Sequence, residues 1–267
     1  MLERKSIITL TSDFGIKDPF VGQMKGVILN INPNVEFVDI THEITPHNIK
    51  EASIACAFSY RYFPPRTVHL VVVDPGVGSA RRPILVVTED HYFIGPDNGV
   101  FSFVYQREKR YLKVFHITAD HYFLKKGSPT FQGRDLFAPV AAWLAKGIPA
   151  SNFGEEITDY NTIYIPEPKK PTKNALEGEV IYIDRFGNAI TNIPLDAVEE
   201  LRKAGGSLRV VYKGRELPMK AHYSEADDEG LKCLINSFDL LEIFVYRGNA
   251  AREHGIKVGD IIGIITR

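Results

Sequence analysis

Residues 67–79, "TVHLVVVDPGVGS", form a nearly continuous run of apolar and β-branched side chains that ends in a glycine-containing turn. A strand of this composition is covered on both faces, which is typical of a parallel sheet packed between helices. The run therefore predicts a central strand of an α/β sheet, with Asp74 at its carboxyl end.

Strand and helix patterns alternate around this run. Runs of β-formers and periodic apolar positions predict strands at 6–12, 35–40 and 111–117 and helices at 18–31 and 48–60. Asp18 is expected to cap the first helix, with Pro19 in its first position. Residues 83–97 predict a hairpin with Glu89 and Asp90 at its tip. This order favours an open, mainly parallel α/β sheet.

The composition shifts at residues 164–174, "YIPEPKKPTKN", where three prolines and three lysines fall within eleven residues. Beyond this stretch, turn residues separate short strand-like runs at 177–184, 208–213, 216–220, 231–236, 241–247 and 260–266, with a short helix near 194–203. Many short strands of this kind predict a small β-barrel or sandwich. We expect an N-terminal α/β domain at 1–165, a linker at 166–174 and a C-terminal β-barrel domain at 175–267.

The overall composition is that of a soluble globular protein. Apolar residues make up 44% of the chain and charged residues 24%, and the net charge of −1 argues against a nucleic-acid partner. No apolar run approaches the roughly 18 to 20 residues of a membrane span, and the N-terminus leads straight into a strand pattern without a signal-peptide core. Cys56 and Cys233 lie far apart without CxxC spacing, so we expect free thiols in a cytoplasmic protein.

Three acidic residues occur where predicted strands end, namely Asp13, Asp39 and Asp74. Each alone is an ordinary turn residue, because aspartate is common in turns. Ligands of open α/β sheets bind outside the carboxyl ends of the strands. Asp13 and Asp74 together therefore point to a site at that edge of the sheet.

The absence of well-known motifs argues against a phosphate loop and against a metal site. The stretch "DPGVGSARR" at 74–82 lacks the Gly-Lys-Ser/Thr ending of a phosphate loop, and a β-rich run follows it instead of a helix. The eight histidines show no HxxxH or HExxH spacing, so we expect no metal site. Asp74 and Arg81 are candidates for an ion pair across this turn, with a solvated salt bridge of little energetic value as the alternative.

Residues 128–144, "SPTFQGRDLFAPVAAWL", combine a polar beginning with an amphipathic pattern. The second half predicts a helix, with Asp135 near the positive end of its dipole. Phe131, Gln132 and Gly133 come just before it. Local chemistry leaves open whether residues 131–135 form part of a reaction site or only start the helix.

A second polar turn occurs in the C-terminal half. "IDRFGNAITNI" at 183–193 places Asp184, Phe186 and Asn188 at alternating positions between two strands. An aromatic face and an amide at this spacing could stack on and hydrogen-bond a purine, and a plain hairpin turn is an equal alternative. Residues 235–253 repeat the pattern, with Asn-Ser at one strand end and Gly-Asn-Ala-Ala at the next.

Seven stretches, taken in order, resemble one known family. They are "TSDFGIKDPFVGQMKGVI", "DITHEITPHNIKEAS", "VVDPGVGSARRPI", "IGPDNGVFS", "PTFQGRDLFAPVAA", "IDRFGNAITNI" and "INSFDLLEIFVYRGNAA". From Ile8 to Arg267 the chain is similar to the S-adenosyl-L-methionine (SAM) hydroxide adenosyltransferases, hydrolase relatives of the fluorinase and chlorinase enzymes. The resemblance implies an α/β domain, a β-barrel domain and a homotrimer. It also implies a substrate bound between the N-terminal domain of one subunit and the C-terminal domain of its neighbour.

The resemblance further implies roles for individual residues. Asp13 would hold the ribose hydroxyls, since a carboxylate accepts from two vicinal O–H groups, and His47 would also contact the ribose. The remaining expected contacts are Asp18, Asp184 and Ser237 for the methionine part and Phe186, Asn188, Asn249 and Ala250 for the adenine. Phe131 would form a lip over the reacting carbon, and Gly133 aligns with the halide-site position of the halogenating relatives.

The implied reaction is in-line attack of water or hydroxide on C5′ of the ribose, giving adenosine and L-methionine without a cofactor. Methionine leaves as a neutral thioether, so the site must supply alignment, partial desolvation and a proton acceptor. The hydrolases order the water with an Asp-Arg-His set. Asp74 and Arg81 match its first two members, and Gln132 stands where histidine is expected.

A glutamine amide cannot take a proton near neutral pH, and three interpretations follow. In the first interpretation, which we favour, the protein is a SAM hydrolase in which Asp74 is the only base. Alternatively, chloride is the nucleophile of a halogenase-type adenosyltransferase, or the chain is a catalytically weak or inactive adenosine- or SAM-binding protein. Gly133 favours chloride because the chlorinase also has glycine there, whereas the carboxylate of Asp74 would repel an anion.

Overall fold

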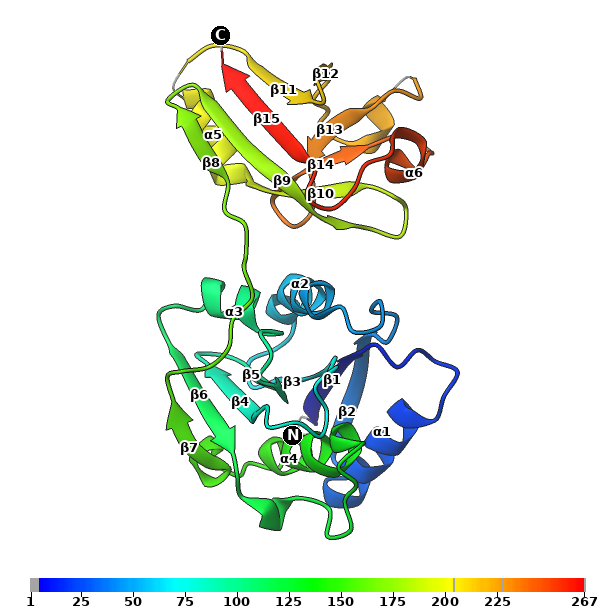
Figure 1. The fold of residues 1–267 in the computed structure, drawn as a ribbon, viewed down its shortest axis with the longest axis vertical. Helices are drawn as coiled ribbons and strands as arrows, with labels where there is room; N and C mark the ends of the chain where they lie inside the picture. Colours follow the sequence, from blue (N-terminus) through cyan, green and yellow to red (C-terminus); the bar gives the residue numbers. More distant parts are fainter. Residues whose placement is uncertain (1–4, 204, 227, 267) are drawn as a thin grey trace. The chain divides into compact units, whose positions relative to one another are not determined.

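The computed structural model describes residues 5–203, 205–226 and 228–266. The chain forms two compact units, Met1–Tyr164 and Ile165–Arg267, and each has its own buried core. The first unit is an α/β sandwich and the second is an antiparallel barrel (Figure 1). The predicted fold class is thereby confirmed.

The first unit is built on one sheet with the strand order β2-β1-β3-β5-β4-β6-β7. Its strands are β1 (Ser6–Ser12), β2 (Val35–Thr41), β3 (Val68–Val72), β4 (Pro83–Thr88), β5 (Tyr92–Pro96), β6 (Leu112–Ile117) and β7 (Gly154–Ile157). Strands β2, β1, β3 and β5 pair in parallel, and β4, β6 and β7 extend the sheet through antiparallel pairs. The predicted hairpin is confirmed, because β4 and β5 pair around Glu89 and Asp90.

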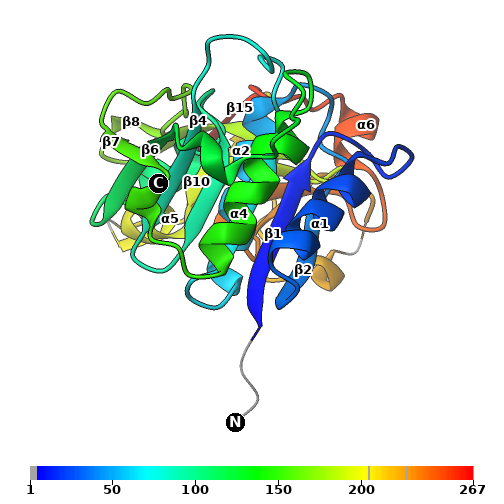
Figure 2. The same cartoon turned by 90° about the horizontal axis from the view of Figure 1, so that it is seen from below.

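Helices cover both faces of this sheet. Helices α1 (Phe20–Ile31) and α4 (Ala138–Ala145) share a core with one face, and α2 (Ile49–Ser59) and α3 (Ser102–Arg107) share a core with the other. Figure 2 shows α1 and α4 side by side across β1. Leu70 and Val72 of the central strand face the first core, and Val71 faces the second. The burial of this strand on both sides is what its apolar run predicted.

Two helix starts differ from the sequence prediction. Helix α1 begins at Phe20 with Pro19 at its N-cap and no side-chain cap, so the predicted capping role of Asp18 is wrong. Helix α4 is preceded by a π-helical turn, Gly133–Phe137, instead of starting at the polar residues. Asp135 lies inside that turn, where it accepts hydrogen bonds from Arg134 and from the backbone of Ser128. Its carboxylate therefore holds the loop together rather than facing an open helix end.

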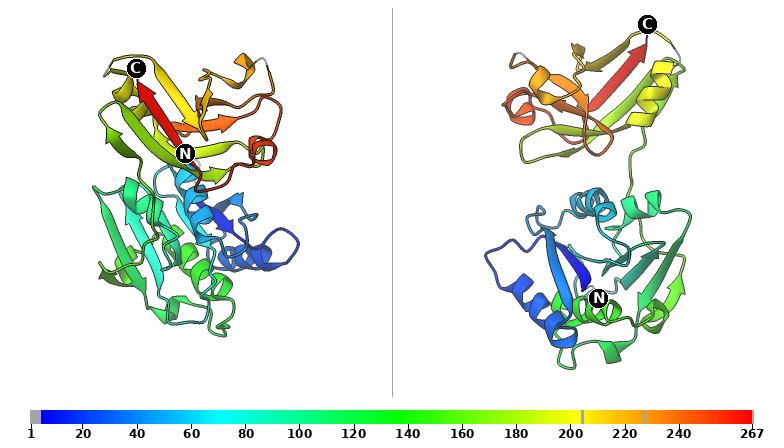
Figure 3. Two further views of the ribbon diagram at one scale, coloured as in Figure 1. Left: turned by 45° about the horizontal axis from the view of Figure 1, so that its top comes forward. Right: turned by 180° about the vertical axis from the view of Figure 1, so that it is seen from behind.

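The second unit is a barrel of antiparallel strands in the order β12-β11-β15-β9-β10-β14-β13. Its elements are β8 (Lys169–Thr172), β9 (Ala175–Ile183), β10 (Ala189–Pro194), α5 (Leu195–Lys203), β11 (Leu208–Tyr212), β12 (Arg215–Leu217), β13 (Lys232–Ile235), β14 (Leu240–Phe244), α6 (Ala250–His254) and β15 (Ile261–Thr266). A bridge between Met219 and Cys233 brings the two ends of the sheet together. Figure 3 shows α5 and α6 on opposite sides of this barrel.

The predicted linker contributes to this barrel. Strand β8 lies within residues 166–174 and pairs with β9, so that part of the segment is an edge strand. In the part of the chain that the structure describes, no helix is long and apolar enough to cross a membrane.

Candidate active site

The chain order of the first unit opens a crevice at one edge of its sheet. Helix α1 connects β1 to β2 on one face, and α2 connects β2 to β3 on the other face. In the strand order β2-β1-β3-β5-β4, the connection after β1 runs to β2 on one side and the connection after β3 runs to β4 on the other. The loops that follow β1 and β3 therefore diverge, which is the position where open α/β sheets bind ligands. A cavity of about 360 Å³ lies there.

The cavity collects the predicted site residues of the first unit. Seven of them line it, namely Asp13, Asp18, His47, Asp74, Phe131, Gln132 and Gly133. The eighth, Arg81, is bonded directly to two of these seven. Phe131, Gln132 and Gly133 all line this cavity, and the π-helical turn begins at Gly133.

Asp74 and Arg81 form a buried, two-point ion pair. Arg81 Nε donates to Asp74 Oδ1 at 2.9 Å, and Nη2 donates to Oδ2. Their side chains are only 6% and 9% exposed, and the guanidinium lies over the Phe137 ring at 5.3 Å. The alternative of a solvated surface pair is therefore wrong. Removing one partner of such a pair would leave an uncompensated buried charge.

Arg81 also fixes the orientation of Gln132. Its Nη2 donates to the side-chain oxygen of Gln132. A guanidinium has only donors, so the amide oxygen must face Arg81 and the amide nitrogen is left for a ligand. The Nη1 atom of Arg81 is buried and has no hydrogen-bond partner within the described chain. Such a buried donor is costly unless a ligand or water satisfies it.

Asp13 is held by the loop that follows β2. Its Oδ2 accepts from the backbone N–H of His47 at 2.9 Å, and its side chain is 9% exposed. His47 has a φ of +68°, a left-handed conformation that costs free energy for a residue with a Cβ. The remaining lone pairs of Asp13 can accept from a ligand that enters the cavity.

Three phenylalanines form the apolar side of the cavity. The rings of Phe14, Phe20 and Phe131 have pairwise centroid distances of 5.3 to 5.8 Å, and the guanidinium of Arg134 lies 5.1 Å from the Phe131 ring. The sequence pattern did not indicate Phe14 or Phe20 as site residues. The only signal for Phe14 is its place beside Asp13, and Phe20 looks like any apolar residue of an amphipathic helix.

Gly133 lets the π-helical turn approach the sheet. A Cβ at this position would lie 3.1 Å from the Phe131 ring and 3.3 Å from the Val72 side chain. Any larger residue would push these neighbours apart or narrow the cavity.

The predicted adenine residues gather in the second unit, together with Asp184, which is predicted to contact the methionine part. Asp184, Phe186 and Asn188 occupy the turn between β9 and β10, and Asn249 and Ala250 start α6. The backbone N–H of Ala251 donates to the carbonyl of Gly187 at 2.9 Å, which brings the two segments together. Gly187 has a φ of +88°, and a Cβ there would lie 2.1 Å from Asn249 Oδ1, so only glycine allows this approach.

Within this group, hydrogen bonds fix the polar atoms and leave the aromatic ring open. Asp184 accepts from the backbone N–H of Asn188 at 2.8 Å and from its side-chain nitrogen at 3.2 Å. Asn249 caps α6 by accepting from the N–H of Arg252 at 2.8 Å. Phe186 is 75% exposed, so its face is available for stacking.

Ser237 lies in a different turn of the same unit, between β13 and β14. Asn236 shapes that turn, because its side-chain oxygen accepts from the N–H groups of Phe238 and Leu240. The side-chain nitrogen of Asn236 donates to Glu242 at 3.0 Å. Burial, together with the nearby charge of Asp184, raises the pKa of Glu242.

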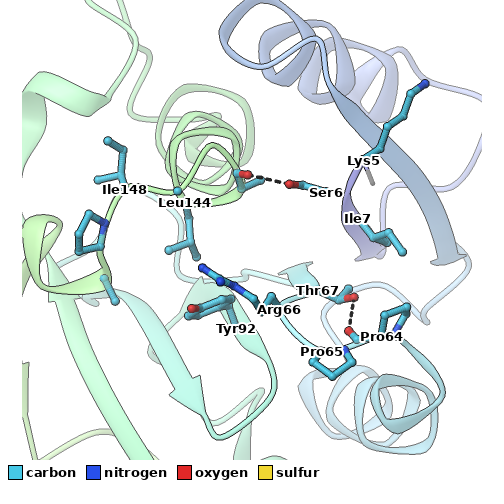
Figure 4. A pocket seen from close by; sticks show the side chains of 14 residues that line it. Lys5, Ser6, Ile7, Pro64, Pro65, Arg66, Thr67, Tyr92, Leu144 and Ile148 are labelled. Carbon is cyan, nitrogen blue, oxygen red and sulfur yellow. Dashed lines mark hydrogen bonds between the residues drawn. The ribbon is translucent and has the colours of Figure 1, made fainter. Parts of the chain in front are cut away.

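A second cavity, of about 470 Å³, lies at the opposite edge of the first sheet. It is lined by the beginning of β1, the segment before β3 and the turn after α4 (Figure 4). Arg66 extends into it beside the Tyr92 ring (Figure 4), and Ser6 donates to the backbone of Ala145 at 2.8 Å. None of the predicted site residues lines this cavity.

The structure offers no cluster of three or more His, Cys, Asp or Glu side chains suited to a metal ion in residues 5–203, 205–226 and 228–266.

Family models of known proteins match both units of the chain. Residues 8–154 match the family model of the SAM hydroxide adenosyltransferase N-terminal domain, and residues 178–263 match that of the C-terminal domain. A protein of Methanocaldococcus jannaschii named (R)-S-adenosyl-L-methionine hydrolase is 39% identical, with 97% of this chain and 95% of that protein covered. A protein of the same name from Thermus thermophilus is 34% identical, with coverages of 93% and 95%.

A more distant relative and a solved structure are also similar to nearly the whole chain. A fluorinase of Nocardia brasiliensis is 28% identical, covering 96% of this chain and 95% of that protein. The crystal structure of an uncharacterized conserved protein from Thermotoga maritima superposes with a TM-score of 0.88 at 38% identity, covering 97% of this chain and 99% of the other. The chain belongs to the SAM hydroxide adenosyltransferase family.

Proposed function

We propose that this enzyme hydrolyses SAM to adenosine and L-methionine by attack of water on C5′ of the ribose. The observation that carries the proposal is the buried set Asp74, Arg81 and Gln132 beside a cavity at the carboxyl ends of β1 and β3. The hydrolase names of the relatives support it, and they specify the (R) diastereomer at sulfur, which we propose is also preferred here.

Asp74 is the proton acceptor in this reaction. The water oxygen bonds to C5′, the C5′–S bond breaks, and its electron pair leaves with the sulfur of methionine. The water proton goes to Asp74, whose oxygens keep lone pairs after accepting from Arg81. Arg81 fixes the direction of that carboxylate, so the base is oriented before the substrate binds.

Gln132 orients the water but takes no proton. With its oxygen held by Arg81, its amide nitrogen donates to one lone pair of the water. The second lone pair then points at C5′ while one O–H points at Asp74. A sulfonium leaving group needs no general acid, so the proposed reaction requires no cofactor.

The phenylalanine side of the cavity favours the transition state. The positive charge of the sulfonium disperses as the C5′–S bond breaks, and an apolar wall of Phe14, Phe20 and Phe131 suits that change better than water does.

The complete site is proposed to form between copies in a homotrimer. Asp13 and His47 of one copy would hold the ribose, and Asp18 would face the methionine ammonium. A neighbouring copy would supply Asp184 and Ser237 for the methionine part and Phe186, Asn188, Asn249 and Ala250 for the adenine. The exposed ring of Phe186 supports this arrangement, since its face is available to stack on an adenine.

Mixing two damaged variants tests the shared site. Asp74→Asn removes the base from the first unit, and a Phe186→Ala, Asn188→Ala double variant removes the adenine contacts from the second. Co-expression of the two inactive chains should restore about a quarter of the wild-type activity through random mixing in a ring. A site formed within one chain would give no recovery, because every chain would carry one damaged half.

A cytoplasmic location is proposed with this function. It is supported by Cys56 and Cys233, which are both buried free thiols, as expected in a reducing compartment.

Chloride is the second candidate nucleophile. The unpartnered Nη1 of Arg81 and the amide nitrogen of Gln132 are donors that would suit an anion. Asp74 opposes it, because a nearby carboxylate repels chloride.

One assay separates these functions. The purified protein is incubated with (R)-SAM and (S)-SAM, with and without chloride, and the products are separated by chromatography. We expect adenosine and methionine in equal amounts, faster from (R)-SAM, with no chloride dependence. The product 5′-chloro-5′-deoxyadenosine would establish the halogenase alternative, and tight SAM binding without any product would establish a binding protein.

A further inference from the structure

A line of polar side chains lies behind Asp13, outside the cavity. Ser12 Oγ is 2.7 Å from His42 Nδ1, and His42 Nε2 is 3.1 Å from Asp39 Oδ1, within ion-pair distance but outside hydrogen-bond geometry. Asp39 Oδ2 in turn accepts from Lys25 Nζ at 2.6 Å. Ser12 and His42 are 2% and 7% exposed, so the inner half of this line is buried.

Adjacent parallel strands bring these residues together. Ser12 is the last residue of β1, and His42 directly follows β2. The two strands are paired up to Thr11 and Thr41, so their carboxyl ends lie side by side. The contact between Ser12 and His42 therefore spans the same sheet edge at which the cavity opens.

The charge of Asp39 determines which of these side chains donate hydrogen bonds and which accept them. Burial raises the pKa of Asp39, but Lys25 and His42 outweigh it and hold that pKa below its ordinary value, so the carboxylate is charged and only accepts. Because Nε2 faces this carboxylate, we assign the tautomer of His42 that carries hydrogen on Nε2, in which Nδ1 accepts from the Ser12 hydroxyl. The lone pairs of Ser12 remain for the backbone N–H of Phe14, which lies 3.4 Å from Oγ.

His42 thus holds the backbone N–H groups of both residues that follow Asp13. It reaches the N–H of Phe14 through Ser12, and its own carbonyl accepts from the N–H of Gly15 at 2.7 Å. Asp13 directly precedes these two amides, and its carboxylate accepts from the backbone N–H of His47, a residue of the loop that His42 begins. The Gly15 contact uses the backbone carbonyl of His42, so the His42 ring itself is linked to the segment of Asp13 through Ser12.

We infer that His42 is a positioning residue for the substrate ribose, acting through Ser12 to aim the carboxylate of Asp13. Asp39 and Lys25 hold the ring of His42 from the outer side. The inference rests on the proposed function, in which Asp13 accepts from the ribose hydroxyls. Because His42 acts on binding and lies away from Asp74, its loss raises KM for SAM by about tenfold and changes kcat by less than about twofold.

The test uses ribose recognition in the full-length protein, with no need for turnover. Calorimetry compares the affinity for adenosine with that for 2′,3′-dideoxyadenosine, which lacks both hydroxyls that Asp13 would hold. The wild type should prefer adenosine by about tenfold or more. Ser12→Ala and His42→Ala should each lose most of this preference, and His42→Asn, whose amide can still bond to Ser12, should recover much of it.

A matched control comes from the same strand. Thr9 Oγ1 and His69 Nδ1 form an equivalent buried bond of 2.8 Å, away from the cavity. Thr9→Val should lower the unfolding temperature and leave the preference for adenosine intact. A purely structural role of His42 would make Ser12→Ala behave like this control.

The outcomes separate this inference from the proposed function. A preference that persists in Ser12→Ala and His42→Ala overturns the inference while leaving the hydrolase assignment intact. A wild type that binds both nucleosides equally contradicts the role proposed for Asp13, and the inference falls with it. Ser12→Ala removes a single oxygen atom, so it supplies the answer even where the larger change at His42 impairs folding.

Discussion

Arg81 donates through one nitrogen atom to both the carboxylate of Asp74 and the side-chain oxygen of Gln132. This shared donor fixes the two groups relative to each other and turns the amide nitrogen of Gln132 away from Arg81. Gln132 can therefore orient a nucleophile as a donor, and Asp74 is the only group of the three that can take a proton near neutral pH.

Gln132→His should raise kcat, by roughly tenfold, because an imidazole adds a second proton acceptor beside the water. Steady-state kinetics with SAM would measure the change, and Gln132→Asn serves as a control that keeps an amide but shortens its reach. An unchanged or lower kcat in Gln132→His would mean that Asp74 alone suffices as the base.

Asp74→Asn should lower kcat by about two to four orders of magnitude, because the proposed base is lost while its shape is kept. It should also lower the free energy of unfolding, by about 3 to 5 kcal/mol if Arg81 is left without a counter-charge. Single-turnover kinetics and denaturant unfolding would measure the two effects.

The control for Asp74→Asn is another arginine-bound carboxylate. Asp159 accepts from Arg82 at 2.8 Å, but its side chain is 78% exposed. Asp159→Asn should leave both kcat and stability nearly unchanged, since exposed pairs contribute little. Full activity in Asp74→Asn would remove this residue from the proposed chemistry.

Gly133→Ala should raise KM several-fold. The added methyl group would lie 3.1 Å from the Phe131 ring and 3.3 Å from Val72, so the cavity must narrow or its walls must shift. Gly22→Ala in α1 is the matched control, because nothing lies within 4 Å of a Cβ there. Equal kinetics in the two variants would show that the space at Gly133 is not used by the substrate.

Acidification should destabilise the fold through two buried histidines. Burial, and the repulsion that a protonated His91 would exert, hold the pKa of His69 well below its ordinary value, and burial also lowers the pKa of His91. The unfolded chain then binds more protons than the folded one below about pH 6.5, so stability falls as the pH falls.

The slope of this loss is at most about 1.4 kcal/mol per pH unit for each histidine. Denaturant unfolding between pH 7.5 and 5 would measure it, and His69→Gln should flatten the curve. A stability that stays constant over this range would contradict the assignment of both rings as neutral in the fold.

Much of the fold could be predicted because its signals are local. The apolar run at 67–79 became β3, buried on both faces, and the pattern at 83–97 became the β4–β5 hairpin. Helices α3 and α6 and strand β7 were missed, since elements of only four to six residues give no clear period. The prediction that Asp18 caps α1 was wrong. An aspartate directly before a proline matches the sequence pattern of a helix N-cap even where its side chain makes no capping hydrogen bond.

The candidate site could be predicted only where chemistry and strand ends coincide in the sequence. Asp13 and Asp74 met that condition, and both line one cavity at the edge of the sheet where open α/β sheets bind ligands. The burial of the Arg81 pair was not predictable, because exposure depends on Phe137, more than fifty residues away. The contact between Ser12 and His42 was missed for the same reason, since it arises only when β1 and β2 pair.

The most direct test of the central claim is hydrolysis of (R)-SAM in water enriched in oxygen-18. Attack of water on C5′ places the label in the 5′-hydroxyl of adenosine and none in methionine, and mass spectrometry of both products would show this. We predict one labelled oxygen per adenosine in the wild type and no adenosine above background in Asp74→Asn. Unlabelled adenosine, or no adenosine from the wild type, would contradict the account.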